Sequence, residues 1–155
     1  MKRFVSRYSN LLRWRQREEE QRRGELIAMR RQRDEIESMR NQLQQKLHQQ
    51  TDFCRQQMIS GITGGLLSVM EMELDNQERY LKQVDQVLLR AEAILAEALQ
   101  KHLDARSELK VVEELVHRER TEHHKKMLKA EELQNQERAM QTYYRNQALQ
   151  TETES

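Results

Sequence analysis

The chain has 155 residues, no proline, and 34% charged side chains. Its mean hydropathy of -1.04 and its 36% apolar content leave too little apolar material for an ordinary globular core, which excludes a compact mixed α/β enzyme domain. Glu, Gln, Lys, Arg, Leu, Met and Ala dominate, and these straight-chain helix formers predict an all-α chain. The net charge of +1 hides an asymmetry, because Lys and Arg outnumber acids by 11 to 4 as far as Arg33 and are outnumbered by 16 to 22 afterwards.

Residues 4–58 are predicted to form the first helix, about 80 Å long. Its interior-facing side chains recur at intervals of three or four residues, although the middle of the series is polar. This first seam runs Phe4, Tyr8, Leu12, Arg15, Glu19, Arg22, Leu26, Met29, Arg33, Ile36, Arg40, Leu43 and Leu47.

Residues 59–65 are predicted to be a turn, because three of the four glycines, Gly61, Gly64 and Gly65, fall together there. A second helix is expected over residues 66–147, about 120 Å long, followed by a frayed tail over 148–155. The whole chain would then be a single coiled-coil domain, a long two-helix antiparallel hairpin with the second helix overhanging.

The second helix carries the strongest periodicity in the sequence, an unbroken alternation of four and three. Of its 23 seam positions, 17 are apolar, and so sustained a period of 3.5 residues predicts a left-handed coiled coil. This second seam runs Leu67, Met70, Leu74, Gln77, Leu81, Val84, Leu88, Ala91, Leu95, Ala98, His102, Ala105, Leu109, Val112, Val116, Glu119, His123, Lys126, Ala130, Leu133, Glu137, Met140 and Tyr144.

Folding about the glycines predicts which residues face each other. Leu26 is expected opposite Ala98, apolar against apolar, whereas Arg22 is expected opposite His102 in a stretch that we predict to be wet and loose. Residues from about Thr121 onward would lack a partner, which would leave an apolar stripe exposed on the overhanging helix.

Enzyme and metal chemistry find no support in the sequence. The glycine cluster has no following Lys-Ser/Thr pair and follows no strand, so it does not predict a phosphate loop. Glu119 and His123 share a helix face, but two ligands fall short of the four that structural zinc needs, and we interpret the pair as a polar face. We predict no enzyme, no cofactor and no metal site.

The basic residues from Arg13 to Arg33, followed by heptads, are similar to a basic-region leucine zipper. Three consecutive glutamates, residues 18–20, interrupt them where phosphates would approach, so we expect no nucleic-acid contact. No apolar run reaches the roughly 20 residues of a membrane span. The single Cys54 and the absence of a leader-like N-terminus predict a protein of the reducing cytoplasm.

Apolar side chains exceed what one seam requires. Leu66, Tyr80, Val87 and Ile94 form a second stripe beside the seam, and a third surface should cover it. The periodicity alone leaves both a partner protein and self-association open.

The layout resembles the FliJ family of flagellar type III export components and, less closely, the YscO-like proteins of virulence secretion. Three local patterns carry the resemblance, and a fourth segment is similar to the C-terminal half of the family. The three patterns are an N-terminal aromatic followed by Leu-Leu, Arg and glutamates (Phe4, Leu11, Leu12, Arg13, residues 18–20), the turn at residues 58–63, and the aromatic-Leu start of the second seam (residues 80–84); the fourth segment is Glu-Glu-Leu at residues 113–115.

This resemblance implies an antiparallel coiled coil similar to the shaft of the rotary ATP synthase gamma subunit. It also implies a non-enzymatic cytoplasmic protein that lies peripherally at the inner face of the membrane through its protein partners. Those partners would be the hexameric export ATPase FliI, the export gate FlhA and export chaperones.

The family's gate site maps here to Leu43, Tyr80, Val84 and Val87. The chain departs from the family at Lys46 and Gln50, where aromatic residues are usual. For the ATPase contact, we hypothesise the terminal end of the hairpin, with Phe4, Tyr8, Leu11, Leu12, Leu133, Met140 and Tyr144. The alternatives are a homo-oligomeric structural coiled coil and a basic-helix nucleic-acid binder.

Overall fold

Two long helices make up the chain. The computed structural model describes the backbone of residues 4–153 as α1 (Ser9–Ser60) and α2 (Gly64–Thr153), with no strand among these residues. The prediction of an all-α helical hairpin is therefore confirmed. Backbone contacts divide the chain into a turn unit, Arg17–Ser107, and a terminal unit, in which residues 4–16 lie with residues 108–153.

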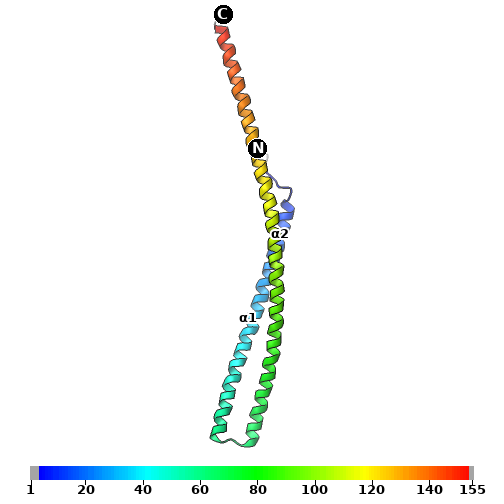
Figure 1. The fold of residues 1–155 in the computed structure, drawn as a ribbon, viewed down its shortest axis with the longest axis vertical. Coiled ribbons are helices and arrows are strands. Elements are labelled where there is room, and N and C mark those ends of the chain that lie inside the picture. The colour runs from blue at the N-terminus through cyan, green and yellow to red at the C-terminus, as the bar shows by residue number, and fades with distance from the viewer. Residues whose placement is uncertain (1–3, 154–155) are drawn as a thin grey trace. The chain divides into compact units, whose positions relative to one another are not determined.

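In the turn unit, α1 and α2 run antiparallel on either side of the turn (Figure 1). Two side-chain pairs fix their register. Arg40 Nε lies 2.8 Å from Asp85 Oδ1, and His102 Nε2 lies 2.9 Å from Glu19 Oε1. Both pairs fall within about one helical turn of the predicted register.

The predicted seams are the shielded faces of the helices. Every predicted position of the first seam is at least partly buried, as is every position of the second seam from Leu67 to His123. The most buried α2 residues recur at seven-residue intervals and are all small, namely Val84, Ala91, Ala98, Ala105 and Val112. Leu26, predicted opposite Ala98, is buried as well, so both sides of the seam are shielded from solvent there.

The first seam continues past Leu47, where the sequence prediction ended it. Gln50, Cys54 and Gln57 extend the same spacing, and each is at least partly buried, with Cys54 a free buried thiol. Their polar or small side chains hid them from a search for apolar periodicity.

The turn is shorter than predicted, because only residues 61–63 lie outside the helices instead of 59–65. Gly61 has a φ of 82°, the left-handed conformation that ends helices at low cost when the residue is glycine. Gly64 and Gly65 need no such conformation and form the first turn of α2, where the Leu67 amide donates to the Thr63 carbonyl at 3.1 Å.

The outer helix bounds also differ from the prediction. Helix α1 begins at Ser9 rather than at Phe4, because the Ser6 hydroxyl accepts a hydrogen bond from the Tyr8 amide at 3.1 Å and caps the chain ahead of the helix. Helix α2 continues to Thr153 rather than ending at 147, since its last residues include good helix formers and neither Gly nor Pro. Residues 154–155 of the predicted frayed tail lie outside the described residues.

Polar side chains in the middle of the seam form ion pairs and hydrogen bonds, whereas the sequence predicted a solvated, loosely packed stretch. His102 faces Glu19 instead of the predicted Arg22, and the two side chains are only 13% and 18% exposed. Arg22 turns along its own helix to Glu25, with Nη1 at 3.0 Å from Oε2. A charged residue at a seam position is tolerated here because a partner one helical turn away satisfies it.

Candidate partner-binding surfaces

The turn-proximal flank of α2 presents apolar side chains to solvent. Tyr80 and Val87 are 48% and 46% exposed, whereas Val84 is only 4% exposed and Leu43 is partly buried. This corrects the expectation that all four side chains face a partner, because Val84 belongs to the seam and supports the flank from beneath.

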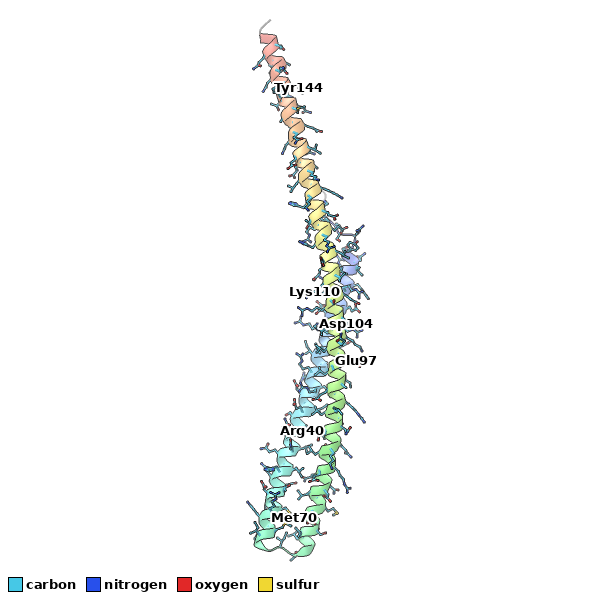
Figure 2. All side chains as sticks on the ribbon, in the orientation of Figure 1. Arg40, Met70, Glu97, Asp104, Lys110 and Tyr144 are labelled. Carbon is cyan, nitrogen blue, oxygen red and sulfur yellow. The ribbon has the colours of Figure 1, made fainter. Side chains whose placement is uncertain are left out.

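Two hollows open between the side chains of α1 and α2 in the turn unit, and one of them reaches the flank at Val87. The one nearer the turn, of about 230 Å³, is lined by Phe53, Val69 and Met70 among others (Figure 2 labels Met70). The other, of about 130 Å³, is lined by Val87 and Ile94 together with residues of α1. The flank is therefore hollowed at Val87, whereas Tyr80 lines neither hollow.

Phe53 is an exposed aromatic side chain that the sequence analysis missed. It lies seven residues after Lys46, one of the two positions at which the resemblance described above implies an aromatic residue. The heptad spacing could have indicated Phe53, since residues seven apart share a face of a coiled-coil helix. An aromatic residue therefore remains on this part of α1, displaced by one heptad toward the turn.

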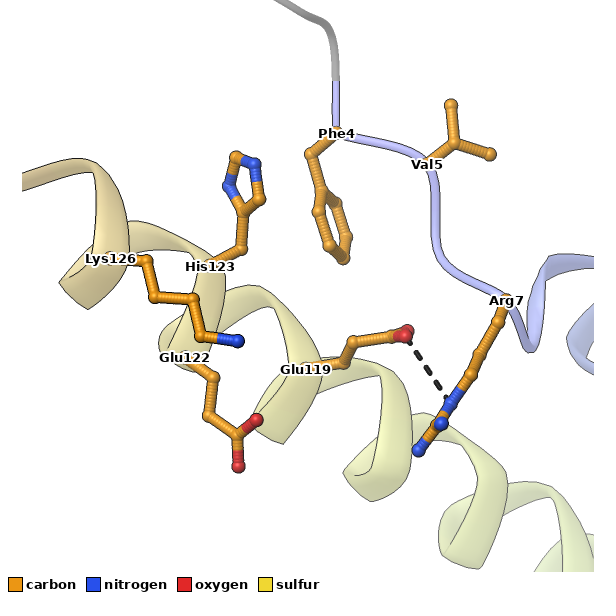
Figure 3. A pocket seen from close by; sticks show the side chains of 7 residues that line it. All are labelled: Phe4, Val5, Arg7, Glu119, Glu122, His123 and Lys126. Atoms are coloured by element: carbon orange, nitrogen blue, oxygen red, sulfur yellow. Dashed lines mark ion pairs between the residues drawn. The ribbon is translucent and has the colours of Figure 1, made fainter. Parts of the chain in front are cut away.

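In the terminal unit, the segment before α1 fastens onto α2, and we name residues 4–8 the N-terminal clasp (Figure 3). The Ser6 hydroxyl donates to Glu119 Oε2, and Arg7 Nε lies 3.4 Å from Glu119 Oε1. Ser6 is buried although it is polar, because its hydroxyl donates to Glu119 and accepts from the Tyr8 amide.

Aromatic contacts complete the clasp. The Phe4 ring lies against the His123 ring with their centroids 5.2 Å apart, and the Arg120 guanidinium lies over Phe4 at 5.9 Å. A hollow of about 470 Å³ opens between the clasp and α2, with Lys126 at its edge. Pairing therefore reaches beyond Thr121, and the unpartnered part of α2 begins later than predicted.

Beyond the clasp, α2 is bare. Every residue from 128 to 151 is exposed, and Figure 2 shows the side chains around Tyr144 standing out from the helix. Leu133, Met140 and Tyr144 lie here, as does Tyr143, which the sequence analysis did not single out and whose ring meets that of Tyr144 edge to face at 5.9 Å.

The residues predicted for the ATPase contact form two groups rather than one. Tyr8 and Leu12 are partly buried, Leu11 is exposed, and Phe4 reaches only as far as His123. Leu133 lies ten residues beyond His123, about 15 Å along the helix. The structure therefore does not bring Phe4 together with the exposed stripe of α2.

The Glu119 and His123 pair is engaged by the chain itself. Glu119 bonds to the clasp and His123 packs on Phe4. Within residues 4–153, no group of three or more His, Cys, Asp or Glu side chains is arranged to hold a metal ion. Among the same residues, neither helix has a stretch long and apolar enough to cross a bilayer.

Two long antiparallel helices that share a seam and expose apolar side chains beside it define a coiled-coil helical hairpin. The chain belongs to the FliJ family, whose model, described as flagellar FliJ protein, matches residues 4–148. Membership confirms the predicted resemblance and makes the chain a component of flagellar protein export. No curated protein and no solved structure matches the chain.

Proposed function

We propose that the chain is a non-enzymatic stalk or adaptor of the flagellar export apparatus, which binds the export ATPase FliI and the export gate FlhA and assists delivery of chaperone-bound substrates. It would work in the cytoplasm, held peripherally at the inner face of the membrane through these partners. The observation that carries the proposal is that each unit exposes large apolar side chains, on the flank of the seam in the turn unit and on the overhanging part of α2 in the terminal unit. Such surfaces on a helical protein are typical of sites where other proteins dock.

The gate contact in this proposal is the turn-proximal flank, with Tyr80 and Val87 as anchors and Leu43 at its edge. Both anchors are half exposed, and Val87 also lines the smaller of the two hollows between α1 and α2. The double variant Tyr80→Ala, Val87→Ala should weaken binding to the gate's cytoplasmic part about tenfold or more, because exposed anchors contribute to binding and little to the fold.

Leu89 offers a matched control, since it is an exposed apolar residue of the same stretch of α2 outside the predicted stripe. Leu89→Ala should leave the gate affinity unchanged. Equal affinities for the double variant and the native chain, both with native helicity by circular dichroism, would remove the gate contact from this flank.

The ATPase contact in this proposal is the bare part of α2, with Leu133, Met140 and Tyr144, assisted by the exposed Leu11 beside Tyr8 and Leu12. Removal of residues 128–155 should abolish stimulation of the ATPase while gate binding persists. The truncated chain still contains Glu119 and His123, so the N-terminal clasp keeps its contacts with α2. Full stimulation by the truncated chain would move the contact to the N-terminal residues.

A further inference from the structure

A glycine lies in the exposed face of α1 without any internal reason for being there. Gly24 is in the interior of a 52-residue helix, has no positive φ, and a Cβ added to it would meet nothing within 4 Å. Glycine weakens a helix interior relative to alanine, because it loses more backbone freedom on folding. No packing contact among the described residues requires the missing side chain.

The side chains next to Gly24 form one patch on the surface of the turn unit. Ile27 is 58% exposed, and Arg23, Arg30 and Arg31 lie three or four residues from it, which places them around it on the helix. A shallow hollow of about 530 Å³ begins at Ile27, Arg30 and Arg31 and continues along the helix to Asp34, Glu35 and Ser38, which lie outside the patch. We name Gly24, Ile27 and the three arginines the Gly24 patch.

The patch carries unneutralised positive charge. Arg31 pairs with Glu35 at 3.2 Å, but neither Arg23 nor Arg30 has an ion pair among the described residues. Arginines that are free of internal partners and flank an apolar side chain match a partner whose apolar residue is flanked by carboxylates.

We propose that the Gly24 patch docks an acidic amphipathic helix of a partner protein. The bare backbone at Gly24 lets that helix approach closely, Ile27 contacts its apolar stripe, and Arg23 and Arg30 bind its carboxylates. Glu20 and Asp34 bound the patch about 21 Å apart along the helix, which suits a short protein segment and repels the continuous phosphates of a nucleic acid. This surface is separate from the gate and ATPase contacts, and its test does not depend on them.

The test uses the full chain and a labelled synthetic helix that carries an Ala and Leu stripe flanked by Glu, with binding followed by fluorescence anisotropy. The Glu helix should bind in a salt-sensitive manner, and the same helix with Gln in place of Glu should bind at least about tenfold more weakly. Arg23→Glu with Arg30→Glu should weaken binding about tenfold or more, whereas Lys82→Glu, an exposed charge elsewhere in the turn unit, should have a much smaller effect.

A second pair of variants tests the role of the bare backbone. Gly24→Leu should weaken binding of the Glu helix, whereas Ala93→Leu, a similar enlargement at an exposed position of α2, should leave it unchanged. Equal binding of the Glu and Gln helices would overturn the proposal, as would native affinity in a helical Gly24→Leu variant. Tighter binding of mixed-sequence double-stranded DNA than of the Glu helix would also overturn it and assign the patch to phosphate.

Discussion

The same substitution at two glycines should change stability in opposite directions. At Gly24, a methyl group enters open space on a helix whose backbone already suits alanine. Gly24→Ala should therefore raise the free energy of unfolding by about 0.8 kcal/mol, the ordinary difference between glycine and alanine inside a helix. For a chain of this size the midpoint of thermal unfolding should rise by about 2–3 °C.

At Gly61, the added methyl group also meets nothing within 4 Å, but the backbone has a φ of 82°. A side chain in this left-handed conformation costs about 1–2 kcal/mol, so Gly61→Ala should lower the free energy of unfolding by that amount. Because neither site is crowded, the difference between the two variants isolates the backbone conformation.

Urea unfolding followed by far-ultraviolet circular dichroism measures both changes, with the dependence on urea concentration expected to stay the same in all three chains. The reasoning would be refuted by a loss of stability in Gly24→Ala, which would mean that the position has a packing role inside the chain. It would equally be refuted by an unchanged stability in Gly61→Ala.

Three further predictions concern the seam and its flanking charges. Glu19→Ala should lower the free energy of unfolding by about 1–3 kcal/mol, because it leaves the largely buried His102 without its partner. A double-mutant cycle with His102→Leu measures the coupling between the two side chains, and additive effects of the two substitutions would contradict this prediction. Val84→Ala should cost about 2 kcal/mol in urea unfolding, because two methyl groups leave a buried site, and a neutral result would place Val84 outside the seam. The hydrogen bond from Arg22, with a second from Gln21, holds the pKa of the Glu25 carboxyl below its ordinary value. The ionised carboxylate therefore contributes to stability above that ordinary value, and the contribution is lost as the pH falls through the lowered pKa. Carboxyl titration by NMR should show the pKa of Glu25 rising in Arg22→Gln, and an unshifted pKa would exclude the hydrogen bond as the cause.

The sequence predicts the helices and their seam well because a period of 3.5 residues has one physical solution, a helix that buries one stripe against another. The burial of Val84 follows from its place in that periodicity. The assignment of Val84 to the gate contact, which came from the family resemblance, conflicts with the same periodicity, because a seam residue faces the other helix. The one-turn shift that pairs Glu19 with His102 could not be read from the register, because long side chains reach neighbours on either side of the opposing position. The N-terminal clasp depends on Ser6 and Glu119, a contact across 113 positions that no local pattern indicates.

The clasp also bears on the order in which the arms come together. Contacts between α1 or the clasp and α2 span 45 positions at Arg40 and Asp85, 83 at Glu19 and His102, and 113 at Ser6 and Glu119. Closing a longer loop costs more chain entropy, so pairing that starts at the turn and proceeds outward meets the smallest barrier at each step. Fastening of Ser6 to Glu119 would then come after the rate-limiting step, and the strength of the clasp governs how long the assembled arms stay together rather than how fast they meet.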